Sequence, residues 1–168
     1  MRLFLTGGMG FIGSHTAVEL IDSGHEVILY DNLSNASCDV AERIERITGT
    51  KPCFIRGDIR DAATLSAALA EHKPDAVIHF AGLKAVGESC QKPLEYYDNN
   101  VYGTLVLLDS MRKTGVFKLI FSSSSTVYGT PQKLPLTEDH PTGGVTNPYG
   151  RTKLFIDCLL YTSDAADE

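Results

Sequence analysis

The stretch LFLTGGMGFIG, residues 3–13, decides how this chain begins to fold. An apolar run at Leu3–Leu5 is followed by four glycines within seven positions. Glycine loses more backbone entropy on folding than any other residue, so this density needs a structural reason. A short strand, a glycine turn and a helix together form the pattern in which a phosphate group approaches the backbone at a helix N-terminus.

The glycines of this turn have separate predicted roles. Gly7 takes the tight turn, Gly10 leaves no Cβ where a pyrophosphate approaches, and Gly13 lets the helix pack closely on the strand. A glycine pattern alone is weak evidence, but the second apolar run ends in an acid, Asp31, eighteen residues beyond Gly13. A glycine-rich turn with a capping acid and no ligand is the simpler alternative.

Asp31 also predicts which dinucleotide would bind. A carboxylate at this position accepts hydrogen bonds from the hydroxyls of an adenosine ribose and repels a 2′-phosphate. Residues 32–39 contain no Arg or Lys that could receive such a phosphate. The sequence therefore favours NAD over NADP as the cofactor.

Apolar runs alternate with amphipathic segments along the rest of the chain. Because the apolar residues of each run are contiguous, the runs predict strands buried on both faces. They lie at Leu3–Leu5, Val27–Tyr30, Cys53–Ile55, Ala76–Phe80 and Lys118–Phe121. Alternating strands and helices predict an α/β fold, a Rossmann-type doubly wound parallel sheet with right-handed crossovers.

Three of the intervening segments have helical spacing. Their core-facing residues are predicted to be Ile12, Thr16, Leu20 and Ile21 in the first, Leu65 and Leu69 in the second, and Leu105, Leu108 and Met111 in the third. The segment Leu134–Gly144, rich in proline, glycine and acidic residues, is predicted to be a surface loop.

Composition narrows the class of protein. The 168 residues are 43% apolar and 21% charged, and the net charge of −6 argues against a nucleic-acid or anionic-membrane partner. No run reaches the ~18 apolar residues of a membrane span. The cysteines Cys38, Cys53, Cys90 and Cys158 lack C-x-x-C spacing, so we interpret them as structural thiols in a reducing cytoplasm. The histidines have no metal-ligand spacing, and no metal is expected.

A second constellation lies near the C-terminal end, in FSSSSTVYG at residues 121–129 and NPYGRTK at residues 147–153. Tyr149 and Lys153 are four apart and share one helix face, and Pro148 suits the first turn of that helix. A phenol with a pKa near 10 is a poor base at neutral pH, but an adjacent ammonium and an oxidised nicotinamide both favour the phenolate. The serines end a predicted strand, where a hydroxyl can reach a substrate oxygen.

These segments resemble the UDP-glucose 4-epimerase (UDP-galactose 4-epimerase) family of the extended short-chain dehydrogenase/reductase superfamily. The resemblance includes DNLSN at 31–35, GDIRD at 57–61, HFAGLKAVGES at 79–89 and KPLEYYDNNVYGT at 92–104, and it is near-continuous over residues 1–157. Members of that family are typically about twice as long. The resemblance thus implies an incomplete NAD-binding Rossmann domain at residues 1–157 that lacks the C-terminal substrate domain.

The resemblance also implies a set of site residues. The pyrophosphate would be held by Gly7, Gly10, Phe11, Ile12 and Gly13; the adenosine ribose by Asp31, Asn32 and Asn35; the adenine would lie beside Asp58 and Ile59; and the inner cofactor path would be lined by Phe80, Ala81, Lys84 and Asn99. Ser124, Tyr149 and Lys153 would form the catalytic group. Simpler roles stay open: a strand and loop cap for Ser124, a surface lysine for Lys84 and a helix cap for Asn99.

The implied activity is inversion at C4′ of a UDP-hexose, UDP-glucose or UDP-galactose, through a transient 4′-keto sugar. Tyr149 would take the proton of the 4′-hydroxyl while C4′ passes hydride to NAD. Ser124 would hold or relay that proton, and Lys153 would bind the nicotinamide ribose and keep Tyr149 acidic. The family also implies a homodimer. The N-terminal apolar run is too short for a signal peptide, so a cytoplasmic location is the default expectation.

Related functions remain as alternatives. A nucleotide-sugar 4,6-dehydratase would carry an Asp-Glu pair after the strand-end hydroxyl, where this chain has Ser125 and Thr126, which argues against dehydration. A 4-epimerase for N-acetylhexosamine, uronic-acid or pentose nucleotides would share these motifs. For this chain by itself, a non-catalytic NAD-binding module is a further alternative.

Residues 158–168, CLLYTSDAADE, depart from the family. Leu154, Ile156 and Leu160 begin an apolar pattern, and residues 162–164 interrupt it. We interpret this segment as a non-native tail of the kind a sequencing artefact produces, with a short divergent terminus as the alternative. The chain as given is expected to be marginally stable and inactive.

Overall fold

The computed structural model describes residues 1–164. By their internal contacts these residues form two units. The first comprises Met1–Ala81 and Leu105–Ser122, and the second comprises Gly82–Thr104 and the described residues from Ser123 onward.

The first unit contains a five-stranded parallel sheet. Its strands are β1 (Arg2–Thr6), β2 (Glu26–Asp31), β3 (Cys53–Arg56), β4 (Ala76–His79) and β5 (Leu119–Phe121), in the order β3-β2-β1-β4-β5. Along the chain, β2 and β3 are therefore added on one side of β1, and β4 and β5 are then added on its other side. This arrangement confirms the predicted Rossmann-type doubly wound sheet and places the predicted strands within one or two residues of their observed bounds.

The strand register brings the candidate residues of this unit to one edge. Thr6 pairs with Tyr30 of β2 and with His79 of β4, so these strands end at the same level. The glycine turn and Phe80 leave the sheet there, and Asp31 ends its strand there. In open α/β sheets, ligands bind outside the carboxyl ends of the strands where the winding direction reverses, which here is between β1 and β4.

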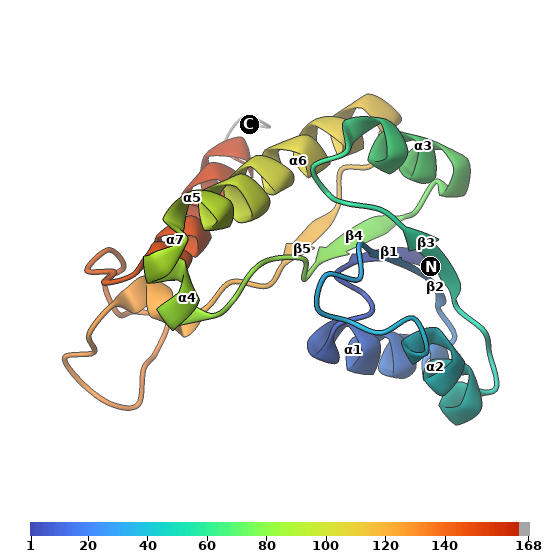
Figure 1. Cartoon of the computed structure of the whole chain (residues 1–168), viewed down its shortest axis with the longest axis horizontal. Helices are drawn as coiled ribbons and strands as arrows, with labels where there is room; N and C mark the ends of the chain where they lie inside the picture. The colour runs from blue at the N-terminus through green and yellow to red at the C-terminus, as the bar shows by residue number, and fades with distance from the viewer. Residues whose placement is uncertain (165–168) are drawn as a thin grey trace. The chain divides into compact units, whose positions relative to one another are not determined.

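Two apolar clusters cover the two faces of the sheet. The helices α1 (Phe11–Asp22) and α2 (Val40–Thr48) lie on one face, and α3 (Ala62–His72) lies on the other (Figure 1). Leu3 and Leu5 of β1 belong to the first cluster and Phe4 to the second, because neighbouring strand residues point to opposite faces. Leu65 and Leu69 are fully buried in the second cluster, as predicted.

Two predictions about burial were wrong. The strands β3 and β5 are not buried on both faces, and Ile120 of β5 is 60% exposed, because each forms an edge of this sheet. In α1 the prediction failed for Ile12, which is exposed, while Leu20 and Ile21 pack against the first cluster as predicted. The fully buried residues of this helix are Gly13 and Ala17. The helix approaches the glycine turn so closely that its smallest residues, rather than its largest, occupy the contact.

The helix α6 (Gly103–Thr114) also differs from its predicted core face. Val106 and Leu107 pack in the core with Met111, while Leu105 is 45% exposed. The predicted core face is therefore correct for Met111 and wrong for Leu105. A π-helical turn, η1 (Tyr97–Tyr102), precedes α6.

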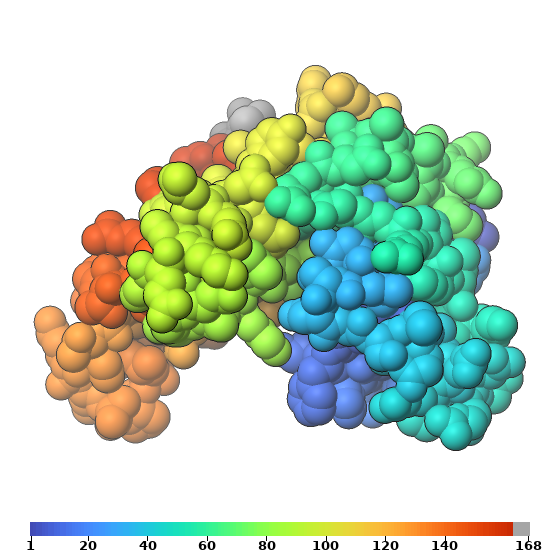
Figure 2. All heavy atoms as spheres, viewed as in Figure 1, coloured from blue at the N-terminus to red at the C-terminus, as the bar shows by residue number. Residues whose placement is uncertain are grey.

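The second unit is mostly helical. It contains α4 (Val86–Gln91), α5 (Pro93–Tyr96), η1, the 3-10 turn η2 (Ser125–Tyr128) and α7 (Pro148–Asp164). Helical residues run on from α5 through η1, so Asn99 lies inside a helix and does not cap its start, which corrects that alternative. Residues 130–147 form no helix or strand before α7, and the predicted loop Leu134–Gly144 lies on the surface in orange (Figure 2), which confirms it.

The interruption predicted at residues 162–164 does not end the last helix, since α7 continues to Asp164. Residues 165–168 of the predicted tail lie outside the described residues. Within the described part of the chain, no helix is both long and apolar enough to cross a bilayer. All four cysteines are free thiols with exposed positions, so none of them is part of the core.

Candidate functional site

The glycine turn is built from backbone that leaves no space for side chains. Gly7 has a φ of +68°, and a Cβ there would lie 2.6 Å from the backbone nitrogen of Ala81. Its N–H donates to the carbonyl oxygen of Tyr30 at 2.8 Å, which fixes the turn to the end of β2. A Cβ at Gly13 would overlap the carbonyl oxygen of Gly7. The predicted tight turn and close helix packing are therefore both present.

Gly10 differs from its neighbours because packing does not require it to be glycine. Its φ of −72° suits any residue, and a Cβ there would approach one described atom, the carbonyl oxygen of Gly7, at 3.3 Å. Gly8, which has no predicted role, is tightly enclosed by Leu5 and Leu29. The open space at Gly10 lies outside the protein, where the prediction places a pyrophosphate.

The N-terminus of α1 begins at this open space. Gly10 is its N-cap and supplies no side-chain hydrogen bond, so the first N–H groups of the helix have no partner from a capping side chain. Phe11 and Ile12 are 74% and 52% exposed. Free N–H groups and the helix dipole at an exposed N-terminus suit an anion.

Asp31 has the structural role of a capping acid, which the sequence analysis gave as an alternative. The residue is 7% exposed, and its carboxylate accepts from the N–H of Met9 at 3.1 Å and from the N–H of Leu33 at 2.8 Å. It thereby joins the glycine turn to the segment after β2, where Leu33 has a φ of 60°. Each carboxylate oxygen has a second lone pair, so these bonds leave acceptor capacity for a ribose hydroxyl.

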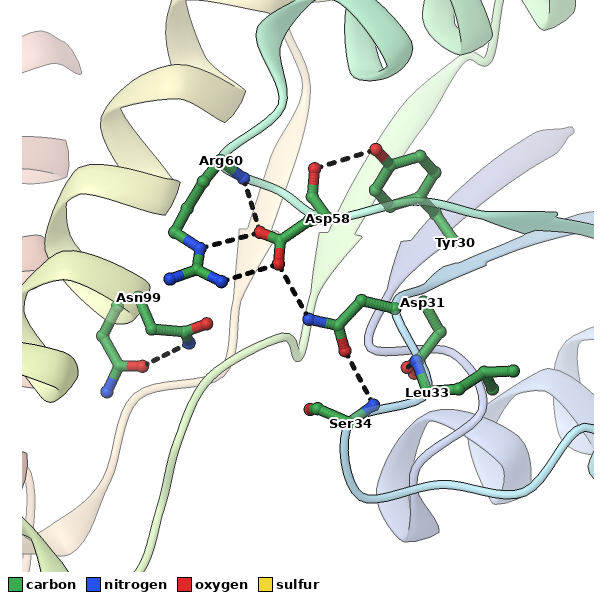
Figure 3. Close-up of polar contacts among 9 residues, drawn as sticks. Tyr30, Asp31, Leu33, Ser34, Asp58, Arg60 and Asn99 are labelled. Atoms are coloured by element: carbon green, nitrogen blue, oxygen red, sulfur yellow. Dashed lines mark hydrogen bonds and ion pairs between the residues drawn. The ribbon is translucent and has the colours of Figure 1, made fainter.

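The segments after β2 and β3 are joined by side chains (Figure 3). Asn32 donates from Nδ2 to Oδ2 of Asp58 at 3.0 Å, and the Arg60 guanidinium donates to both oxygens of the same carboxylate, at 2.9 Å and 2.8 Å. The hydrogen bonds from Arg60 hold the pKa of Asp58 well below its usual range. Tyr30 donates to the carbonyl oxygen of Asp58 at 3.0 Å, and burial raises the pKa of Tyr30. Arg60 stands in the quoted motif GDIRD but has no predicted role.

The other predicted residues of the first unit differ in accessibility. Ile59 is 5% exposed and packs in the core, so its side chain is not free to face an adenine. Asn35 is exposed. Phe80 and Ala81 follow β4 and bond to Thr6, through its carbonyl oxygen and its hydroxyl.

In the second unit, a buried asparagine that was not predicted connects three segments. Asn100 is 2% exposed, and its Oδ1 accepts from the N–H of Leu83 at 2.8 Å and from Nδ2 of Asn99 at 2.9 Å. Its Nδ2 donates to the carbonyl oxygen of Leu83 at 2.9 Å and to Oγ1 of Thr152 at 3.1 Å. Lys84, beside Leu83, is exposed. Asn100 lies in the π-helical turn η1, a feature frequently found at functional sites, but no sequence signal pointed to this residue.

The same network reaches the turn that carries Tyr149. Thr152 is fully buried, and its hydroxyl donates to the carbonyl oxygen of Tyr149 at 2.7 Å. Asn147 caps the helix, because its Oδ1 accepts from the N–H of Gly150 at 2.8 Å. The first turn of α7 is therefore held by the buried hydrogen bond from Thr152 and by the capping hydrogen bond to Asn147.

Ser124 lies on a segment that packs against that turn. Its Oγ accepts from the N–H of Thr126 at 3.3 Å and from Oγ1 of Thr126 at 3.0 Å, so it caps η2. A Cβ on Gly150 would lie 3.1 Å from Oγ1 of Thr126. The structure thus brings the serine segment to the helix turn beside Tyr149. The capping contact of Ser124 is present, and its catalytic role stays a prediction.

Tyr149 and Lys153 lie on one helix, α7, at the spacing that places them on the same face. Lys153 is 6% exposed, and burial lowers its pKa to about 8, while the carboxylate of Asp157 acts in the opposite direction. Among the described residues, no group of three His, Cys, Asp or Glu side chains could hold a metal ion.

The family model and the relatives that match this chain are all nucleotide-sugar epimerases or dehydratases. Residues 4–166 match the family model described as GDP-mannose 4,6 dehydratase. The UDP-glucose 4-epimerase of Haemophilus influenzae is 53% identical over 167 residues, and that of Bacillus subtilis is 51% identical over 167 residues. Both alignments cover 99% of this chain and 49% of the relative, so the chain spans about half the length of the relatives it matches.

Two solved structures have the same fold over the whole chain. The UDP-glucose 4-epimerase of Bifidobacterium longum, in complex with NAD+ and UDP, is 55% identical with a TM-score of 0.97, over 99% of this chain and 50% of that one. The enzyme of Stenotrophomonas maltophila, with bound NAD and formylated UDP-arabinopyranose, is 48% identical with a TM-score of 0.97, over 100% of this chain and 50% of that one. The predicted resemblance to UDP-glucose 4-epimerases is confirmed, and the chain belongs to the GDP-mannose 4,6-dehydratase family of nucleotide-sugar epimerases and dehydratases.

Proposed function

We propose that this chain is the NAD-binding half of a UDP-hexose 4-epimerase, which inverts C4′ of UDP-glucose and UDP-galactose through a transient 4′-keto sugar. The observation that carries the proposal is the arrangement on α7. Tyr149 and Lys153 share one face, and the segment of Ser124 packs beside the turn of Tyr149. Relatives about half identical to this chain are UDP-glucose 4-epimerases.

The residues of the first unit suit NAD. Gly10 leaves open space that the protein does not fill, the N-terminus of α1 provides N–H groups for a pyrophosphate, and Asp31 keeps acceptor capacity for a ribose. The proposed cofactor residues are Gly7, Gly10, Phe11, Ile12, Gly13, Asp31, Asn32, Asn35, Asp58, Ile59, Phe80, Ala81, Lys84 and Asn99, with Ile59 contributing backbone, because its side chain is buried. Bound NAD would accept the hydride of C4′ and return it.

The proposed chemistry of the chain's own residues is proton transfer at the 4′-oxygen. Tyr149, as a phenolate, takes the proton of the 4′-hydroxyl, and Ser124 holds or relays it. Lys153 favours the phenolate through its positive charge. With a pKa of about 8, Lys153 is roughly nine-tenths charged at pH 7, so the site keeps this charge in spite of burial.

The same segment favours epimerisation over dehydration. Dehydration at C4′–C5′–C6′ requires an acid and a base close to the sugar, and the two positions after Ser124 hold Ser125 and Thr126. Oγ1 of Thr126 donates to Oγ of Ser124, so this position carries a hydroxyl in a fixed bond rather than an acid. A hydroxyl cannot take the role of a carboxylate near neutral pH.

For the 168-residue chain by itself we propose NAD binding without turnover, and a homodimer for the longer protein. Exposed aromatic side chains support the second proposal. Tyr102 is 51% exposed and Phe155 on α7 is 56% exposed, and aromatic rings at the surface are enriched where proteins contact one another. We further propose that residues 158–168 are not native sequence.

Two measurements test these proposals. Isothermal titration of the chain should show binding of NAD with at least tenfold preference over NADP. Sequencing the source locus past codon 157 should show an open frame for a second half, whose product interconverts UDP-galactose and UDP-glucose. Equal affinity for NADP would contradict the role of Asp31. A longer product that releases a 4-keto-6-deoxy sugar, or that acts on pentose, uronic-acid or N-acetylhexosamine nucleotides alone, would contradict the substrate assignment.

A further inference from the structure

One acidic side chain of α7 bonds to the serine segment. Oδ2 of Asp157 accepts a hydrogen bond from Oγ of Ser123 at 2.6 Å, and Asp157 is partly buried. Ser123 directly precedes Ser124 in the chain. The bond therefore fixes the backbone next to the hydroxyl that the proposed function uses.

Asp157 continues the row of residues formed by Tyr149 and Lys153. The three positions are spaced by four residues, so they lie one above another on the same face of α7. At the first turn of this row, Thr126 packs against Gly150, and at the third turn Ser123 bonds to Asp157. The serine segment is thus attached to α7 at two levels, and Ser124 lies between the two attachments.

We propose that Asp157 is a positioning residue, which holds Ser123, and with it Ser124, along the face of α7 that carries Tyr149 and Lys153. The proposal rests on the proposed function, since it gives Ser124, Tyr149 and Lys153 their chemical roles. In this role Asp157 acts through Ser123, from whose hydroxyl it accepts a hydrogen bond, and through the charge of Lys153.

Charge supports the same assignment. A carboxylate one helical turn from a buried ammonium stabilises its charged form, and Asp157 opposes the lowering of the Lys153 pKa by burial. Burial raises the pKa of Asp157, while the bond from Ser123 and the charge of Lys153 oppose that change. Glu138 and Asp139 line the same open depression of about 1030 Å³ as Asp157, but Asp157 alone of these three stands on the helix of Tyr149 and Lys153.

The test uses the 168-residue chain labelled with 13C-lysine and 15N, and Lys153→Arg assigns the Lys153 signal. Asp157→Asn keeps the shape but removes the charge, Ser123→Ala removes the bond but keeps the charge, and Asp157→Glu is the conservative rescue. Asp109→Asn, which removes a carboxylate one turn from Lys113 on exposed α6 surface, is the matched control. Two readouts are recorded: the titration midpoint of Lys153, and hydrogen exchange at the amides of Thr126 and Val127, which donate to Ser124.

Asp157→Asn should move the Lys153 midpoint below the wild-type value, with little change in exchange at both amides, because its Oδ1 can still accept the hydrogen bond from Ser123. Ser123→Ala should speed exchange while leaving the midpoint near 8. Asp157→Glu and Asp109→Asn should resemble the wild type. An unchanged midpoint in Asp157→Asn, or unchanged exchange in Ser123→Ala, would overturn the proposal. NAD binding is measured in a separate titration, and absence of binding would overturn the proposed function. The Lys153 midpoint and the amide exchange rates would still decide the role of Asp157.

Discussion

The glycine turn of the first unit and the Asn100 network of the second each fix a candidate site residue. The first does so through backbone atoms, and the second through side-chain hydrogen bonds. Around Gly7 and Gly13 the backbone itself fills the space, and Asp31 bonds to backbone N–H groups. Around Asn100 and Thr152 the geometry depends on buried side-chain hydrogen bonds. A substitution that adds a Cβ should therefore destabilise the glycine turn, whereas a substitution that removes a polar atom should destabilise the Asn100 network.

Gly13→Ala should have the largest effect. Its methyl group would overlap the carbonyl oxygen of Gly7, which is backbone and cannot rotate away. We expect a loss of about 3 kcal/mol or more in the free energy of unfolding, measured by urea denaturation. The control is Gly87→Ala in α4, where a Cβ meets nothing within 4 Å; it should be neutral or stabilising by about 0.5–1 kcal/mol. Equal changes in the free energy of unfolding for Gly13→Ala and Gly87→Ala would contradict the claim that backbone atoms fill the space around Gly13.

Asn100→Leu should have the next largest effect, because it leaves the N–H and carbonyl of Leu83 without their partner and removes the bond that the Thr152 hydroxyl accepts. Unpaired buried polar groups should reduce the free energy of unfolding by about 2–4 kcal/mol. Asn147→Ala, which removes one capping bond at the surface end of α7, should lose about 1 kcal/mol. Hydrogen exchange of the α7 amides locates the loss, and a stable Asn100→Leu variant would contradict the role of the network.

Lys153→Met should stabilise the chain at pH 7 by about 1–3 kcal/mol, because it removes a buried charge. The pKa of Lys153 is about 8 in the folded chain and 10.5 when unperturbed. Between these values the folded state binds fewer protons than the unfolded state, so wild-type stability rises with pH. The advantage of the variant should therefore shrink from pH 8 to pH 10.5 in urea titrations. A constant difference, equal to that of the exposed control Lys113→Met, would contradict the burial of Lys153.

Asn32→Ala should have the smallest effect. It removes the bond to Asp58 and the bond from the N–H of Ser34, but these groups are half-buried or exposed. We expect a loss of about 0.5–1 kcal/mol in urea denaturation, because water replaces the lost partners. A loss above 2 kcal/mol would show that the first unit also depends on side-chain hydrogen bonds. It would then not differ in this respect from the Asn100 network of the second unit.

The sequence was sufficient for the features that depend on local patterns. Contiguous apolar runs located all five strands, and the glycine spacing located the turn between β1 and α1. The spacing of Tyr149 and Lys153 predicted a shared helix face, because helical geometry needs no knowledge of the rest of the fold. The core faces of α1 and α6 were correct only in part. Leu20, Ile21 and Met111 pack in or against the apolar clusters, whereas Ile12 and Leu105 are exposed.

Features that depend on distant partners could not be predicted. Asn100 bonds to Leu83, 17 residues away, and to Thr152, 52 residues away, and no local pattern links those positions. The bond between Ser123 and Asp157 spans 34 residues. Burial of Ile59 likewise follows from the tertiary packing of the first unit. A polar residue reveals such a role only when the fold brings its partners together.

The most direct test of the central claim is a calorimetric titration of NAD into the wild-type chain and into Gly10→Ala. A Cβ at this position would meet one atom, the carbonyl oxygen of Gly7 at 3.3 Å, which has to move by a few tenths of an ångström, so the variant should lose about 1 kcal/mol of stability. If the open space is the place of a pyrophosphate, the wild type binds NAD and the folded variant binds at least tenfold more weakly. Equal affinity for NAD in the two folded chains would contradict this assignment.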